Sequence, residues 1–241
     1  MLPGKLEILY EDEYIIAINK PPKMLVIQDR FNKLEENLHD ILAKLYKEIY
    51  TLHRLDKETS GVIIFAKDSL THKELSIQFE KHKVQKIYHL LVKGLPKENV
   101  GVINLPIGKK NAHENLMVID KKNGKPSITN YKVVKKFKQY TLIEAMPLTG
   151  RTHQIRVHFK AIGLPLAVDK LYSNNEKIFL SDIKPKFTPS VKGEKPLMER
   201  LTLHAYSIEF IHPNTKQKMR IVAEHFKDFR SLLRNLEKYG N

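Results

Sequence analysis

The sequence predicts an α+β protein, with more strands than helices and with hairpins in place of regular βαβ units. Short runs rich in Val, Ile, Tyr and Thr recur along the chain, separated by Gly, Pro and charged turns. Helical periodicity is confined to a few segments, and these do not alternate with the strands as a parallel sheet would require. A chain of 241 residues without internal repeats or a clean linker is expected to form a single domain over 1–241.

The first hundred residues are expected to contain three or more strands and two helices. Residues 8–10 and 14–19, split by Glu-Asp-Glu, predict a hairpin, and the Lys-Pro-Pro-Lys segment at 20–23 ends it in an extended turn. Asn37 is a plausible N-cap for a helix whose apolar stripe comprises Leu38, Ile41, Leu42, Leu45 and Ile49. Residues 62–66 predict a buried strand, Asp68 a second N-cap with Leu75 and Phe79 facing the core, and 87–92 a strand closed by Gly94.

The second part of the chain continues as strands, with two more helices. Residues 131–134 and 141–146 are the clearest strands, and 201–210 and 219–222 flank the turn at His212-Pro213-Asn214. Thr152 is expected to cap a helix that ends at Gly163, with a core stripe of Ile155, Phe159 and Ile162. Residues 173–200 lack periodicity and are interpreted as an insertion or mobile loop. An amphipathic helix that includes Phe226, Phe229, Leu232, Leu233 and Leu236 is expected to follow.

Charge and composition indicate a polyanionic partner and exclude several classes of site. The chain has 42 Lys and Arg against 27 Asp and Glu, a net charge of +15, which is typical of nucleic-acid binding. The absence of cysteine excludes disulfides, thiolate nucleophiles and Cys-based zinc sites. No apolar run approaches a membrane span, and acidic residues interrupt any signal-peptide core near the start. We therefore expect a cytoplasmic monomer without membrane contact.

The segment His53-Arg54-Leu55-Asp56-Lys57-Glu58-Thr59-Ser60-Gly61 carries the most specific chemistry. It places Asp56 in a turn beside two basic residues, directly before an apolar strand, where catalytic groups tend to lie on a rigid scaffold. Composition alone favours a simple turn-capping role for Asp56. About a hundred residues downstream, the block Thr149-Gly150-Arg151-Thr152-His153-Gln154-Ile155-Arg156-Val157-His158 puts Arg156 one helical turn from His153.

Metal binding is not expected, although the chain has 11 histidines. His153 and His158 are five positions apart, so they lie roughly 140° apart around a helix and cannot share a metal as an i, i+4 pair can. A metal-dependent hydrolase acting on RNA is therefore disfavoured. Tyr88, at the start of a predicted strand, is either a core residue or an aromatic platform for an unstacked base.

Together these motifs resemble those of RluA-type pseudouridine synthases, almost from end to end of the chain. The matching segments are 7–22, 53–67, 86–94 and 149–172, with Arg200–Ala205 and His212-Pro213 resembling the closing segment. The resemblance implies a catalytic domain with a large mixed, mainly antiparallel sheet, flanking helices and an RNA-binding cleft. It also implies that no S4-type RNA-binding domain precedes the catalytic domain, because the first motif starts near residue 6.

The resemblance also implies the roles of individual residues. Asp56 is the catalytic aspartate, Tyr88 the active-site aromatic and Arg156 the basic partner that pairs with Asp56, while Arg54 inserts into the RNA as the target base leaves. His53, Arg151, His153 and Lys20 are expected to contact RNA as well. The chain departs from the family where Lys23 and Val168, before Asp169, replace the usual glycines.

The implied activity is isomerisation of uridine to pseudouridine in structured RNA, ribosomal or transfer, with no cofactor. The alternative is a basic RNA-binding protein that has lost catalysis and acts in RNA folding or ribosome assembly. Retention of Asp56, Tyr88 and Arg156 favours the enzyme.

Overall fold

The computed structural model describes residues 6–29, 32–111, 116–188 and 193–240. They divide into two compact units, each built from two stretches of chain. Unit 1 comprises 1–87 with 204–224, and unit 2 comprises 88–203 with 225–241. The strands form mixed, mostly antiparallel pairs with few helices, so the α+β prediction is confirmed. The expectation of one domain over the whole chain stays a prediction.

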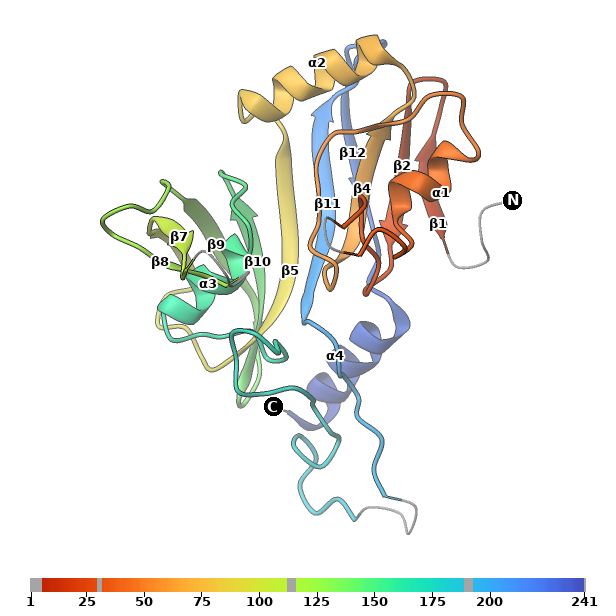
Figure 1. Cartoon of the computed structure of the whole chain (residues 1–241). Helices are drawn as coiled ribbons and strands as arrows, with labels where there is room; N and C mark the ends of the chain where they lie inside the picture. The colour runs from red at the N-terminus through yellow and green to blue at the C-terminus, as the bar shows by residue number, and fades with distance from the viewer. Residues whose placement is uncertain (1–5, 30–31, 112–115, 189–192, 241) are drawn as a thin grey trace. The chain divides into compact units, whose positions relative to one another are not determined.

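Unit 1 contains the strand order β1-β2-β4-β11, with β12 paired to β11 off this path (Figure 1). These strands span Glu7–Glu11, Ile15–Lys20, Ser60–Ala66, Leu203–Ile211 and Lys218–Val222, and the short β3 (Tyr50–Thr51) pairs with β4. All pairs are antiparallel except β4 with β11. Every residue of β2 and β4 is buried, and for β4 the apolar run 62–66 predicted this burial.

Two helices accompany these strands, and their N-caps are the predicted ones. Asn37 caps α1 (Leu38–Ala43) by accepting a hydrogen bond from the Asp40 N–H, and Asp68 caps α2 (Ser69–Glu80) in the same way. The length predicted for α1 was wrong, because the helix ends at Ala43 and Leu45 is 44% exposed. The chain beyond it is drawn into pairing with β4 instead.

Unit 2 holds the antiparallel array β5-β10-β9-β6, spanning Gln85–Lys93, Tyr140–Pro147, Ile128–Lys136 and Val100–Asn104. Successive side chains of β5 point to opposite faces. Leu90 and Val92 pack with α3 (Gln154–Ala161), whereas Leu91 packs with α4 (Lys227–Tyr239). The strands therefore have a helix on each face.

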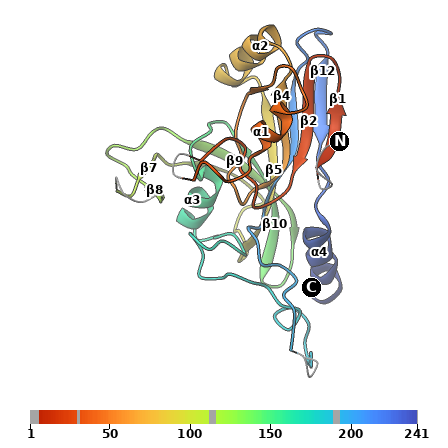
Figure 2. The same cartoon turned by 45° about the vertical axis from the view of Figure 1, so that its right-hand side comes forward.

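A two-stranded hairpin, β7 (Ile107–Lys109) with β8 (Met117–Ile119), lies beside α3 (Figure 2). Ile107 joins Val157 and Tyr172 in a small apolar cluster beneath it. In the segment 173–200, which was interpreted as an insertion or mobile loop, Ile178 and Met198 are buried in the core cluster around α4. Part of this segment thus contributes to the core of unit 2, while other described residues in it are exposed.

The start of α3 differs from prediction, whereas its end is the predicted one. The N-cap is His153, not Thr152, and its backbone is left-handed, with φ of 55°. Ile155 and Phe159 are buried as expected, but Ile162 lies beyond the helix and is 37% exposed. The helix ends at the predicted place, with Ile162 as its C-cap and with Gly163, whose φ is 75°, directly after it.

Candidate active site

Asp56 lies in a tight turn immediately before β4. Its carbonyl oxygen accepts a hydrogen bond from the Thr59 N–H at 3.0 Å. Leu55 and Thr59 on either side are buried, while Asp56 is partly exposed and Arg54 is exposed. The turn is thus anchored in the core of unit 1, and it contains one partly exposed acidic residue beside an exposed arginine.

A glycine lets β4 begin directly after this turn. Gly61 has φ of 115°, a left-handed conformation that side chains rarely adopt. A Cβ at this position would collide with the backbone of Ala205 on β11, its partner in the parallel register. The Thr-Ser-Gly sequence therefore allows the turn and the close approach of the two strands.

Lys20 connects the Asp56 turn to the preceding turn at 21–24 through hydrogen bonds. Its ammonium group donates hydrogen bonds to the carbonyl oxygens of Pro21 (3.1 Å), Met24 (2.8 Å) and Lys57 (3.1 Å). The residue is 0% exposed, so it has no surface with which to meet a phosphate. The predicted RNA contact for Lys20 is therefore corrected to a structural role, tying the 21–24 turn to the turn of Asp56.

His53 is partly buried and is held by contacts within unit 1. Its Nε2 accepts the backbone N–H of Ile64 at 3.2 Å, and its ring stacks on Phe79 with centroids 4.9 Å apart. Burial, with a smaller contribution from the charge of Lys86, lowers the His53 pKa from 6.5 to about 3. A neutral ring that accepts a strand N–H has a structural role, and the predicted RNA contact of His53 stays a prediction.

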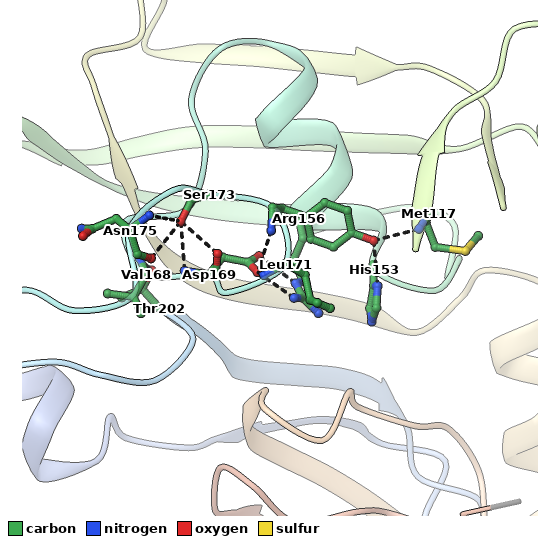
Figure 3. Close-up of polar contacts among 10 residues, drawn as sticks. Met117, His153, Arg156, Val168, Asp169, Leu171, Ser173, Asn175 and Thr202 are labelled. Atoms are coloured by element: carbon green, nitrogen blue, oxygen red, sulfur yellow. Dashed lines mark hydrogen bonds and ion pairs between the residues drawn. The ribbon is translucent and has the colours of Figure 1, made fainter. Parts of the chain in front are cut away.

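In unit 2, Arg156 on α3 is buried and paired, unlike a solvated helix arginine. Its Nε and Nη2 donate to the two carboxylate oxygens of Asp169, at 2.8 and 2.7 Å (Figure 3). The guanidinium carbon lies 4.8 Å from the ring centre of Tyr172. The sequence placed Asp169 in a matching motif but assigned it no role, and Tyr172 was not singled out.

Tyr172 connects this arginine to its surroundings. Its hydroxyl accepts the Met117 N–H of β8 at 2.9 Å and lies 2.8 Å from His153 Nδ1. His153 is the partly exposed residue with the left-handed backbone. Non-glycine residues in that conformation cost about 1 kcal/mol or more and persist where surrounding contacts enforce them. The predicted RNA contact of His153 stays a prediction.

Gln154 fixes the start of α3 to β9. Its amide nitrogen donates to the Ile128 carbonyl and contacts Thr129 Oγ1, both at 3.0 Å. Its amide oxygen accepts from the Thr149 hydroxyl and the Arg151 N–H. The exposed side chain of Arg151 extends from this rigid base, which is compatible with its predicted RNA contact.

The remaining predicted site residue, Tyr88, lies on β5 opposite Ala145. It is partly buried against the apolar cluster that includes Phe159. Asp56 belongs to unit 1, whereas Tyr88 and Arg156 belong to unit 2. The pairing of Asp56 with Arg156 therefore stays a prediction.

His153 and His158 lie in different environments, as their spacing predicted. His158 is buried between Thr129 Oγ1 and the Leu105 carbonyl. Across the part of the chain that the structure describes, no three His, Asp or Glu side chains are grouped as potential metal ligands. Within the same ranges, no helix is both long and apolar enough to cross a bilayer.

Comparison with known proteins identifies the family of this chain. The family model described as RNA pseudouridylate synthase matches residues 14–161, which include Asp56, Tyr88 and Arg156. The chain belongs to this family. The resemblance seen in the sequence motifs is thereby confirmed, and the protein is a pseudouridine synthase.

Similar proteins cover nearly the whole chain. An uncharacterized RNA pseudouridine synthase of Aquifex aeolicus is 35% identical over 98% of this chain and 74% of its own length. Ribosomal large subunit pseudouridine synthase C of Buchnera aphidicola is 37% identical, over 95% of this chain and 70% of its own. The dual-specificity RNA pseudouridine synthase RluA of Vibrio cholerae is 33% identical, over 87% and 79% respectively.

Comparison with solved structures also finds the fold of this family. Human RNA pseudouridylate synthase domain containing 4 matches with a TM-score of 0.73 and 26% identity, over 95% of this chain and 92% of that one. This match supports the predicted pseudouridine synthase fold.

Proposed function

We propose that this pseudouridine synthase isomerises uridine in structured RNA, ribosomal or transfer, with Asp56 as the catalytic carboxylate. The observation that carries the proposal is the position of Asp56 in a chain of this family. It lies in a turn anchored between buried Leu55 and Thr59, immediately before the fully buried strand β4. Similar proteins are named for ribosomal large subunit RNA and for dual RNA specificity.

The chemistry requires a carboxylate, and this one is suitably placed. The C1′–N1 bond of uridine breaks, a C1′–C5 bond forms, C5 loses its proton and N1 gains one, so the product is an isomer. A carboxylate near C1′ and C6 can act as nucleophile or base while the free uracil is retained and rotated. No redox step is involved.

The target base has to leave its stack before it can reach such a group. Arg54 is exposed two residues before Asp56, and we propose that it inserts into the RNA as the base leaves. Tyr88 is the proposed platform for the flipped base and Arg156 the proposed basic partner of Asp56. Exposed Arg151 and the net charge of +15 supply attraction for the phosphates.

The test is replacement of Asp56 by asparagine, which keeps the shape and removes the reacting carboxylate. Tritium release from RNA labelled at C5 of uridine measures the reaction directly. Asp56→Asn is expected to abolish release while RNA affinity stays within a few-fold of wild type. Glu58→Gln removes one negative charge from the same turn and is the matched control, expected to retain turnover within about twofold.

Two outcomes would contradict the proposal. An Asp56→Asn variant that converts uridine in bulk would show that another group performs the chemistry. A wild-type protein that binds RNA but releases no tritium from any RNA, including total RNA from cells lacking the gene, would favour the alternative of an inactive RNA-binding protein.

A further inference from the structure

The Arg156 guanidinium is immobilised along one edge by two parallel hydrogen bonds. Nε donates to Asp169 Oδ2 and Nη2 donates to Asp169 Oδ1. Such a bidentate pair fixes the plane of the guanidinium as well as its position. The Asp169 side chain is fully buried and that of Arg156 is 5% exposed, so water does not compete for these bonds.

Asp169 itself is fixed by the backbone that follows it. Its Oδ1 also accepts the N–H groups of Leu171 (2.9 Å) and Tyr172 (3.2 Å). These bonds make the carboxylate a rigid acceptor that does not depend on Arg156 for its orientation. Arg156 is therefore positioned by Asp169, and the reverse dependence is weaker.

The loop that carries Asp169 is held in turn by its neighbours, as Figure 3 shows. The Ser173 hydroxyl bonds to the carbonyl oxygens of Asp169 and Asn175, and the Asn175 amide donates to the Ala167 carbonyl. Val168 exchanges hydrogen bonds with Thr202, its N–H donating to the Thr202 hydroxyl. The Asp169 backbone thus has little freedom to shift.

Tyr172 contacts the Arg156 guanidinium through its aromatic ring. The ring centre lies 4.8 Å from the Arg156 guanidinium carbon, a cation–π contact. Because the Tyr172 hydroxyl is bonded to Met117 and lies beside His153, the ring cannot tilt away without breaking these contacts. The arginine is therefore fixed along one edge and over one face.

We infer that Asp169 is a positioning residue of the reaction, which acts by holding the Arg156 guanidinium, with Tyr172 completing the hold. The inference rests on the proposed function, since it assumes that Arg156 assists the chemistry. The position of a catalytic group contributes strongly to the reaction rate, and a displacement of that group by about 1 Å can lower the rate roughly a hundredfold. Asp169 touches Arg156 and not the substrate, so its effect reaches the substrate only through Arg156.

Three single variants and one double variant test this inference. Asp169→Asn turns one acceptor into an amide that faces an Arg156 donor. Asp169→Glu keeps the charge but moves the carboxylate by about one bond length. Arg156→Met removes the guanidinium. In the two Asp169 variants kcat is expected to fall roughly 10- to 100-fold with KM within about threefold. The kcat of Arg156→Met is expected to fall by at least as large a factor.

The double variant Asp169→Asn with Arg156→Met separates positioning from general damage. If Asp169 acts through Arg156, its kcat will equal that of Arg156→Met within about twofold, because the group to be positioned is already gone. The double variant also avoids an unpaired buried charge, which makes it the variant most able to fold. Melting curves establish that each protein is folded under assay conditions.

A matched control exists in the same unit. Arg200 forms a second bidentate pair, with Asp228 on α4. Asp228→Asn breaks that pair and is expected to lower the melting temperature while kcat of the folded protein stays within about twofold.

Two results would overturn the inference, and neither depends on Asp56. Full turnover in folded Asp169→Glu or Asp169→Asn would show that the hold on Arg156 is dispensable. Losses that multiply in the double variant would show that Asp169 acts independently of Arg156. If Asp56→Asn is inactive in the same assay, either result removes the inference and leaves the proposed function standing. An active Asp56→Asn removes the proposed function itself.

Discussion

Acidification is predicted to destabilise unit 1 through one imidazole, that of His53. The partly buried ring accepts the Ile64 N–H through Nε2, and its desolvation lowers its pKa to about 3. A protonated ring would place an N–H against the N–H of Ile64 and would break this contact. The perturbation is therefore a change of pH from 7 to 5, compared between wild type and His53→Gln, which has an amide oxygen as acceptor but no titratable group.

The sign and size follow from proton linkage. The unfolded chain binds a proton at His53 near pH 6.5, whereas the folded protein excludes it until about pH 3. Stability from His53 is therefore complete above pH 6.5 and falls as the pH drops from there toward 3. Between pH 7 and pH 5, this one group lowers the free energy of unfolding by about 2 kcal/mol.

Urea unfolding followed by far-UV circular dichroism measures this loss, since the chain has no tryptophan to report by fluorescence. Burial also lowers the pKa of His89 to about 4 and of His225 to about 3. Both remain in the variant, so the difference between proteins isolates His53. His53→Gln is expected to lose about 2 kcal/mol less than wild type on going to pH 5. His72→Gln, which removes an imidazole from α2, is the control.

An equal loss in wild type, His53→Gln and His72→Gln would refute the reasoning. It would mean that the folded protein accepts a proton at His53 as readily as the unfolded chain, and the ring would then be available for the RNA contact first expected of it.

Three further predictions concern charge, metal and backbone. The RNA binding constant is expected to fall as salt is added, with a slope of roughly −3 to −6 for its logarithm against the logarithm of salt concentration, or about 0.7–0.9 for each phosphate neutralised. Filter binding at a series of salt concentrations measures this slope. A slope near zero would mean that the net charge serves solubility alone. Turnover in the presence of EDTA is expected to equal turnover without it when both are measured on RNA folded in the same way. A loss of turnover in EDTA that zinc or magnesium specifically restores would contradict this prediction. Lys23 adopts φ of 64°, a conformation that glycine adopts without strain, so Lys23→Gly is expected to raise the unfolding free energy by up to about 1 kcal/mol. The melting temperature would then be about 2–4 °C higher, and an unchanged or lower melting temperature would contradict the prediction.

Local signals in the sequence determined most strands and both side-chain N-caps. The apolar runs that became β2 and β4 are buried throughout, because a continuous apolar segment must be covered on both faces. Asn37 and Asp68 cap their helices through hydrogen bonds to residues three positions on, an interaction that needs no tertiary partner. The motif around Asp56 likewise indicated the family, because its spacing is local.

Helix lengths depended on contacts that the sequence does not display. The apolar stripe that predicted a helix to Ile49 continues in sequence, yet α1 ends at Ala43 and Tyr50 pairs with Ala66 of β4. Strand pairing between distant segments outweighed helical propensity there, as tertiary context often does.

The roles of individual basic side chains were decided by tertiary structure alone. Lys20, His53 and Arg156 are all basic, and on composition basic residues are expected at the surface. Lys20 is instead enclosed by three carbonyl oxygens, His53 accepts a strand N–H, and Arg156 is held by Asp169. A buried polar group requires a hydrogen-bonding partner, and the folded chain supplied these partners from neighbouring residues, such as Pro21 and Met24 for Lys20, and from more distant ones, such as Ile64 for His53 and Asp169 for Arg156. The sequence therefore proposed Asp56, Tyr88 and Arg156 for the candidate site, but only the fold showed that Arg54 is exposed and that Arg156 is held by the buried Asp169.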